Sequence, residues 1–361
     1  MAEATTNSTS LGVDNTIENG KEQPKKLINL LRGWPAPSLL PASGLQSAAN
    51  YVLSDPEIAV PVLQYGIDPG YQPLREEVAR WLSEMYKYPS AGIGSGSGSE
   101  GSSGGGSQGG ISTGITADEI TITGGASQSL ACVLQSFTDP GYTRAVWVVA
   151  PCYFMACPIF EDSGFRGRLR AVPEDEAGVD VGVLERRLRE YEAEEWKNHP
   201  FKNPYPDRKL YRHVIYLVAT CANPSGKTMP LARRQQLVHL AREHDALIIS
   251  DDVYDFLQWP VTPQIPTSPS PSPLPPLLPL LSQIDAALPP SRHNPPGKDF
   301  SHAISNASFS KLVGPGIRTG WIHATPDFAY GFSVTGTNRS GGAASQFAAG
   351  VVWRMLSIGE L

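Results

Sequence analysis

Apolar residues recur along this chain with two different periods, and segments of the two kinds alternate. Within residues 73–87 they return every three or four positions, which is typical of an amphipathic helix. Elsewhere they form short runs that are nearly all apolar, as expected for strands covered on both faces of a parallel sheet. The predicted strands are Ile120–Thr123, Ala145–Val149, Val214–Val218 and Ala246–Ser250.

Helical patterns fill the intervals between these strands and follow the last of them. The alternation of strand and helix predicts an α/β fold, a three-layer αβα sandwich with a mostly parallel central sheet. Ligands of such sheets bind beyond the carboxyl ends of the strands, so candidate residues are sought there. The further predicted helices are Ser127–Phe137, Val181–Trp196, Leu231–His244 and Ala343–Leu356.

Three segments break this pattern with low-complexity composition. Residues 1–26 form a polar tail, about 89–114 is almost entirely Gly and Ser, and about 260–298 is dense in Pro and Ser. Such compositions bury too little surface to offset the entropy lost on ordering. We therefore expect a disordered tail and one large domain, residues 27–334, interrupted by two surface insertions.

Composition narrows the possible partners. The net charge of −6 offers no basic surface for nucleic acid, and no apolar run reaches the ~18 residues that a membrane span needs. Four scattered cysteines lack the spacing of a zinc site, so we expect free thiols and no metal. The first 25 residues are polar and carry acids, unlike a signal or transit peptide, which predicts a cytoplasmic protein.

The segment Ser308–Lys311, with Arg318 seven positions after the lysine, has two interpretations. Alone it favours a solvated loop. The alternative is an amine held near a phosphate that the serines and the arginine bind.

Asp251 and Tyr254 follow the predicted strand Ala246–Ser250. An acid there either caps the next helix or keeps a pyridine nitrogen protonated, so that the ring accepts electrons.

Three further motifs also follow predicted strands. Asn223, in the turn Asn-Pro-Ser-Gly, is either a plain turn residue or a donor to a ring oxygen. The glycine turn before Ala126 and Ser127 leads into a helix, whose free N–H groups suit a phosphate. Tyr153 either stacks on a flat ring or packs in the core.

In this order the motifs resemble the class I/II aminotransferases, the fold type I pyridoxal-phosphate enzymes. The resemblance covers about residues 28–361 apart from the insertions, and its opening phrase, residues 28–41, looks most like fungal aminotransferases related to the 2-aminoadipate group. It implies pyridoxal 5'-phosphate as cofactor and an exchange of amino and keto groups between an amino acid and a 2-oxo acid.

The resemblance also implies a role for each residue. Lys311 would form a Schiff base with the cofactor and move protons between Cα and C4′, in a desolvated setting that depresses its pKa. Asp251 would pair with the pyridine nitrogen, Tyr254 and Asn223 with the phenolic oxygen, and Tyr153 would stack on the ring. Tyr65 would reach the cofactor of a neighbouring subunit, which implies a homodimer. The implied phosphate ligands are Ala126, Ser127, Ser308, Ser310 and Arg318.

The C-terminal part departs from the family. Residues 335–361 resemble only the start of a small domain, and nothing matches the family arginine that grips the substrate carboxylate, for which Arg339 is not a convincing substitute. Three readings therefore stay open: an aminotransferase, a cofactor-binding but catalytically impaired paralogue, and another reaction of the same cofactor, such as decarboxylation or elimination. A ligand-sensing regulator is a fourth class, but residues 1–27 are too short for its DNA-binding domain.

Overall fold

The computed structural model describes residues 34–361 except 87–113, 197–198, 203–205, 258–276 and 343. Within these residues lies an eight-stranded sheet with the order β1-β8-β7-β6-β5-β2-β3-β4. Strands β7, β6, β5, β2 and β3 run parallel, whereas β8 is antiparallel to β7 and β1, and β4 to β3. The strands are β1 (Ile120–Thr123), β2 (Ala145–Ala150), β3 (Leu169–Asp175), β4 (Gly178–Val179), β5 (His213–Leu217), β6 (Ala246–Asp251), β7 (Ala303–Ser308) and β8 (Gly320–His323).

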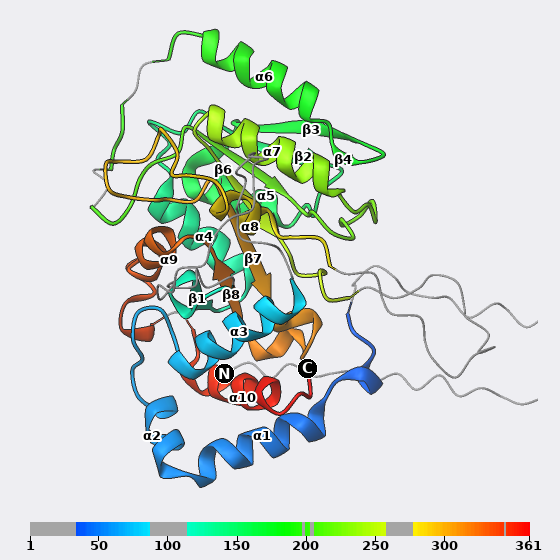
Figure 1. Ribbon diagram of the computed structural model, residues 1–361, viewed down its shortest axis with the longest axis vertical. Helices are drawn as coiled ribbons and strands as arrows, with labels where there is room; N and C mark the ends of the chain where they lie inside the picture. Colours follow the sequence, from blue (N-terminus) through cyan, green and yellow to red (C-terminus); the bar gives the residue numbers. More distant parts are fainter. Residues whose placement is uncertain (1–33, 87–113, 197–198, 203–205, 258–276, 343) are drawn as a thin grey trace, which may run out of the picture.

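Helices cover both faces of this sheet, which confirms the predicted three-layer sandwich (Figure 1). Helices α4, α5 and α9 pack on one face, and α6, α7 and α8 pack on the other. The helices are α1 (Ala42–Ser54), α2 (Pro56–Leu63), α3 (Gln72–Met85), α4 (Ala126–Phe137), α5 (Ala156–Phe160), α6 (Val181–Ala193), α7 (Leu231–Glu243), α8 (Leu281–Ala286), α9 (Pro326–Ser333) and α10 (Gln346–Ser357).

The two-residue period of each central strand divides its side chains between the two faces. On β5, Tyr216 packs with the α4 face while Ile215 packs with the α7 face. On β6, Ile249 lies on the α4 face and Ile248 on the other. Asp251, two residues beyond Ile249, therefore ends its strand on the α4 face of the sheet.

A third apolar cluster joins the two ends of the described chain. Helices α1, α2, α3 and α10 pack together and against the end of the sheet formed by β1, β8 and β7, where Phe309 and Trp321 are buried. Figure 1 shows α10 between α1 and α3. The prediction that residues 335–361 begin a further domain stays a prediction, as do the other domain limits.

The Pro- and Ser-rich segment corrects one expectation. Residues 277–298 are not a loose insertion, because α8 forms within them and buries Leu281, Ile284 and Asp285. The cluster of leucines before α8 supplies the apolar surface that the rest of the segment lacks. The expected tail at 1–26, residues 89–113 of the insertion expected at about 89–114, and residues 260–276 of the Pro- and Ser-rich segment lie outside the described residues.

Among the described residues, no helix is both long and apolar enough to cross a membrane. Within the same part of the chain, no three His, Cys, Asp or Glu side chains gather in a way that suits a metal ion. The four cysteines are free.

Candidate active site at the carboxyl ends of the strands

Asp251 is the buried acid at the carboxyl end of β6. Its Oδ2 accepts a hydrogen bond of 2.7 Å from the Tyr216 hydroxyl, while Oδ1 has no partner among the described residues. Burial raises the pKa of Asp251 to about 6, although the Tyr216 hydrogen bond and the positive charge of Lys311 both oppose the rise. A buried oxygen without a donor costs free energy, which a protonated ring nitrogen beside it would recover.

Lys311 ends the short helical turn Phe309–Lys311 that follows β7. Its Nζ lies 5.9 Å from the centroid of the Tyr254 ring, and its charge acts on Asp251, so amine and carboxylate border the same space. The side chain is exposed. The desolvated setting expected around this lysine is therefore not present within the described chain alone.

Tyr254 and Asn223 come from neighbouring strands and meet at their ends. The Asn223 side chain hydrogen-bonds the Tyr254 hydroxyl, which lowers the pKa of the tyrosine, but burial raises that pKa by more. Asn223 lies in the turn after β5, and Tyr254 lies just beyond β6. Together they present an amide and a hydroxyl to one position, as a phenolic oxygen requires.

The turn between β1 and α4 has the geometry of an anion site. Gly125 has φ +102°, a backbone conformation that other residues rarely adopt, and a Cβ there would lie 2.6 Å from Nη2 of Arg318. Helix α4 begins at Ala126 without a side-chain cap, which leaves its first N–H groups open to a ligand. Arg318 donates from Nη2 to the Gly124 carbonyl at 2.7 Å, which fixes its guanidinium beside this helix end.

Serine hydroxyls border the same turn. Ser308 Oγ donates to Ser310 Oγ at 2.8 Å, and Arg318 Nη1 donates to Ser310 Oγ at 3.4 Å. Ser127 is exposed in the first turn of α4, and its hydroxyl has no partner in the described part of the chain. Helix terminus, guanidinium and hydroxyls are the donors that a phosphate takes.

Of the two remaining tyrosines that were predicted at the site, Tyr153 lies near the other residues and Tyr65 does not. Tyr153 follows β2, is half-buried, and lies close enough to Tyr216 and Tyr254 to act on their ionisation. Tyr65 lies between α2 and α3 with 88% of its surface exposed. It does not join the other site residues within the described chain.

Sequence reasoning missed residues that support this site from the sheet. Asn306 on β7 is in register with Asp251 on β6; its Nδ2 donates to the Ala126 carbonyl at 3.0 Å and its Oδ1 accepts from Ser129. Asn306 thereby fixes the first turn of α4 against the sheet. The available signal was polar side chains within fully buried strands, Asn306 on β7 and the Tyr216 hydroxyl on β5.

These residues fit pyridoxal phosphate. The cofactor presents a ring nitrogen, a phenolic oxygen, an aldehyde and a phosphate. The described residues offer an unpaired carboxylate oxygen, an amide–hydroxyl pair, an amine and a helix terminus with an arginine. Each of these groups stands at the carboxyl edge of the sheet, where the fold predicts a ligand.

Comparisons with known proteins agree with this chemistry. An uncharacterized protein of Saccharomyces cerevisiae is 34% identical over 92% of this chain and 72% of its own length. Aromatic-amino-acid aminotransferase 1 of Thermococcus litoralis is 27% identical over 84% of this chain, and the 2-aminoadipate transaminase of Thermus thermophilus is 26% identical over 83%. The chain spans 55% and 56% of those two relatives.

Solved structures share the fold. An archaeal alanine:glyoxylate aminotransferase superposes with a TM-score of 0.64 at 23% identity, over 93% of this chain and 64% of that one. The family model for class I and II aminotransferases matches residues 108–330, more than half of the 361 residues. This chain therefore belongs to the class I and II aminotransferase family.

Proposed function

We propose that this protein is a pyridoxal-phosphate-dependent aminotransferase that moves an amino group between an amino acid and a 2-oxo acid, with Lys311 as the residue that binds the cofactor covalently. One observation carries the proposal. Asp251 keeps an unpartnered, buried carboxylate oxygen in the space that Lys311 also borders. Membership of the class I and II aminotransferase family supports the proposal.

The bound cofactor supplies an aldehyde that amines attack and a ring that takes up the electron pair left at the substrate Cα. Asp251 holds a proton on the ring nitrogen, for which its carboxylate must be ionised. A pKa of about 6 leaves it mostly ionised at pH 7 and above. Tyr254 and Asn223 bind the phenolic oxygen, and Tyr153 covers a face of the ring.

Lys311 has two roles in this proposal. Its amine would anchor the cofactor covalently, and as a free amine it would move the proton between the substrate Cα and C4′. Ser308, Ser310, Arg318 and the first turn of α4 hold the phosphate, so that the ring stays in place while Lys311 is free.

We further propose a homodimer in which Tyr65 completes the partner's site. Its exposure of 88% and its separation from the chain's own site support this role. The cytoplasmic location stays a proposal as well, supported by four free thiols, which are usual in a reducing compartment.

The direct test of Lys311 is spectroscopic. The purified full chain, loaded with pyridoxal phosphate and dialysed, should retain a visible absorbance band, and borohydride should fix the cofactor on Lys311 in a peptide map. Lys311→Ala should lose both. Lys298→Ala is the matched control, because that lysine pairs with Asp327 at 2.9 Å on the opposite edge of the sheet. An unchanged band in Lys311→Ala, or cofactor fixed elsewhere, contradicts the proposal.

Activity is then measured with a panel of amino donors against 2-oxoglutarate. Transfer of the amino group to form glutamate supports the aminotransferase. Release of CO₂ or of a β-substituent would instead identify another reaction of the cofactor. A loaded protein that turns over no donor would identify the impaired paralogue.

A further inference from the structure

We propose that Tyr216 is a positioning residue that holds Asp251 with one oxygen turned toward the cofactor's ring nitrogen. The inference rests on the proposed function and names a residue that sets the charge of the same site. Tyr216 itself touches neither cofactor nor substrate in this proposal. It acts through the carboxylate.

The register of the sheet places the two residues together. Tyr216 on β5 pairs with Ile249 on the parallel strand β6, and Asp251 stands two residues further along β6. Because side chains alternate between faces, all three lie on the α4 face. A tyrosine is long enough to cross this diagonal, and its hydroxyl reaches Asp251 Oδ2 at 2.7 Å.

The tyrosine has little freedom to turn away. Its side chain is 1% exposed, and the Phe160 ring of α5 packs against it edge-on, with ring centroids 5.5 Å apart. The phenol also stays protonated, because burial and then the negative charge of Asp251 raise its pKa well above the ordinary value. Tyr216 is therefore a fixed donor over the whole working pH range.

A fixed donor has two consequences for the acid. It occupies Oδ2, so the free oxygen is always Oδ1, and this defines where a ring N–H binds. It also stabilises the ionised carboxylate against burial. Among the described groups that act on Asp251, Tyr216 and Lys311 both favour ionisation, and Tyr216 in turn feels Tyr153 and Cys152.

The decisive measurement needs no cofactor. In the apo chain, the Asp251 carboxyl is titrated by carbon NMR or infrared difference spectroscopy, with Asp251→Asn identifying its signal. Tyr216→Phe should raise the Asp251 pKa by about one unit, since a hydrogen bond to a charged group contributes about 1.5 kcal/mol or more. The control is Tyr211→Phe, which removes another buried tyrosine hydroxyl. Tyr211 lies just before β5 and donates to the carbonyl of Ser301, which lies just before β7. It should leave the Asp251 pKa unchanged.

The loaded protein supplies a second readout. Tyr216→Phe should still bind pyridoxal phosphate through Lys311, with kcat lower by about 10-fold, KM within about 2-fold, and the acid limb of the pH–rate profile moved upward by the same unit. Should Tyr216→Phe fold poorly, 3-fluorotyrosine at position 216 keeps the shape and donates more strongly. It should lower the Asp251 pKa.

The outcomes separate the two proposals. A chain that never binds pyridoxal phosphate contradicts the proposed function, while the apo titration still decides whether Tyr216 sets the ionisation of Asp251. An Asp251 pKa that stays the same in Tyr216→Phe or with 3-fluorotyrosine overturns the role of Tyr216, whether or not the protein is an enzyme. An equal shift in Tyr211→Phe overturns it too.

Discussion

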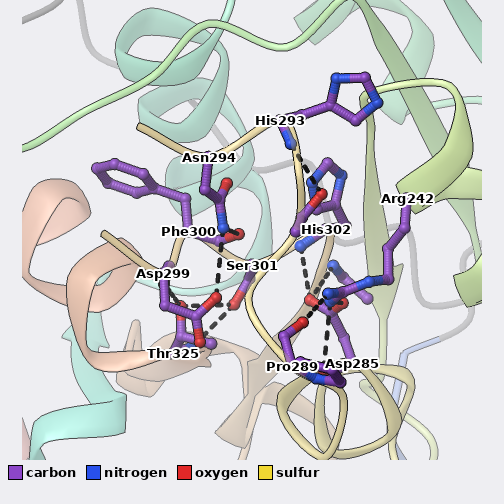
Figure 2. Close-up of polar contacts among 12 residues, drawn as sticks. Arg242, Asp285, Pro289, His293, Asn294, Asp299, Phe300, Ser301, His302 and Thr325 are labelled. Carbon is purple, nitrogen blue, oxygen red and sulfur yellow. Dashed lines mark hydrogen bonds and ion pairs between the residues drawn. The ribbon is translucent and has the colours of Figure 1, made fainter. Parts of the chain in front are cut away.

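Buried carboxylates lie near both ends of strands β5, β6 and β7. Those at the two ends differ in how many of their oxygens accept hydrogen bonds. At the amino ends Asp285 of α8 is fully partnered: its Oδ1 accepts from Arg242 at 2.5 Å and its Oδ2 from the backbone N–H groups of His302 and Ala303. Figure 2 shows this closed network, in which Arg242 also reaches the Pro289 carbonyl. At the carboxyl ends Asp251 keeps one oxygen without a donor in the described chain.

One lysine near each end of these strands shows the same difference in how well its hydrogen bonds are satisfied. Lys209, at the amino ends, is 6% exposed and bonded to buried Asp245 at 2.7 Å. Lys311, at the carboxyl ends, is exposed and makes no ion pair among the described residues. Burial raises the pKa of Asp285, Asp245 and Asp251 alike, so a raised pKa does not distinguish a site from a scaffold. Other buried atoms, such as His302 Nε2 at the amino ends, also have no partner in the described chain, but the free oxygen of Asp251 lies where the charge of Lys311 acts on it.

Asp285→Ala carries the largest expected effect of this comparison. It leaves two backbone N–H groups without an acceptor and the Arg242 guanidinium with carbonyl partners but no carboxylate, and breaking a buried pair in this way costs about 3–5 kcal/mol. Urea unfolding of the apo chain measures the loss. The folded fraction should bind pyridoxal phosphate with unchanged affinity. A loss below 1 kcal/mol would show that the network is not what holds this edge together.

Asp251→Ala should lower activity strongly and stability little, the opposite of what we expect for Asp285→Ala. Transamination by the loaded protein should fall on the order of 10²–10³-fold, since a preorganised charge beside the reacting ring is removed. The free energy of unfolding should not fall as it does in Asp285→Ala, because a poorly satisfied carboxylate is lost. The cofactor should still bind through Lys311. Retained activity, or a stability loss equal to that of Asp285→Ala, would contradict the view that Asp251 serves the cofactor while Asp285 stabilises the fold.

This contrast also marks what the sequence reveals. The period of apolar residues predicted the layers, because it is a local pattern. Local turn motifs also singled out Asn223, Asp251 and Lys311, and the roles of these residues, which the family resemblance implies, stay predictions. The register that brings Tyr216 to Asp251, and Asn306 to α4, is set by packing between strands far apart in the chain. Composition misled in the Pro-rich segment, where a few leucines are enough to bury α8. The exposure of Lys311 was missed because desolvation depends on what surrounds the site.

The pH dependence of stability offers a sharper test of Asp251. Its pKa is about 6 in the folded apo chain against 3.8 for an unperturbed aspartate, so the folded state holds the proton more tightly. The associated stabilisation is fully present only well below pH 3.8 and is lost as the pH rises through 6. Relative to Asp251→Asn, the apo protein should lose about 2–3 kcal/mol between pH 4 and pH 7.5. The difference cancels other titrating acids, including Asp285 and Asp245.

Loading with pyridoxal phosphate should reduce this dependence, because the ring N–H pairs with the ionised carboxylate and lowers its pKa. Chemical unfolding at a series of pH values, with and without cofactor, measures both curves. A flat difference between the apo protein and Asp251→Asn would mean that Asp251 titrates at its ordinary pKa. A slope that persists unchanged in the loaded protein would mean that the cofactor does not meet this acid.

The smallest effect separates two serines on one helix. Ser127, exposed at the start of α4, should contribute only to the ligand: Ser127→Ala should leave stability within ~0.5 kcal/mol and weaken cofactor binding about 5-fold, the loss of one hydrogen bond to phosphate. Ser136, buried near the end of α4, is hydrogen-bonded to Thr335 at 2.6 Å, so Ser136→Ala should cost about 1 kcal/mol and leave binding unchanged. If both variants changed stability alone, or cofactor binding alone, the comparison would fail. A hydroxyl's having or lacking a hydrogen-bond partner in the apo chain would then not distinguish structural residues from ligand-binding ones.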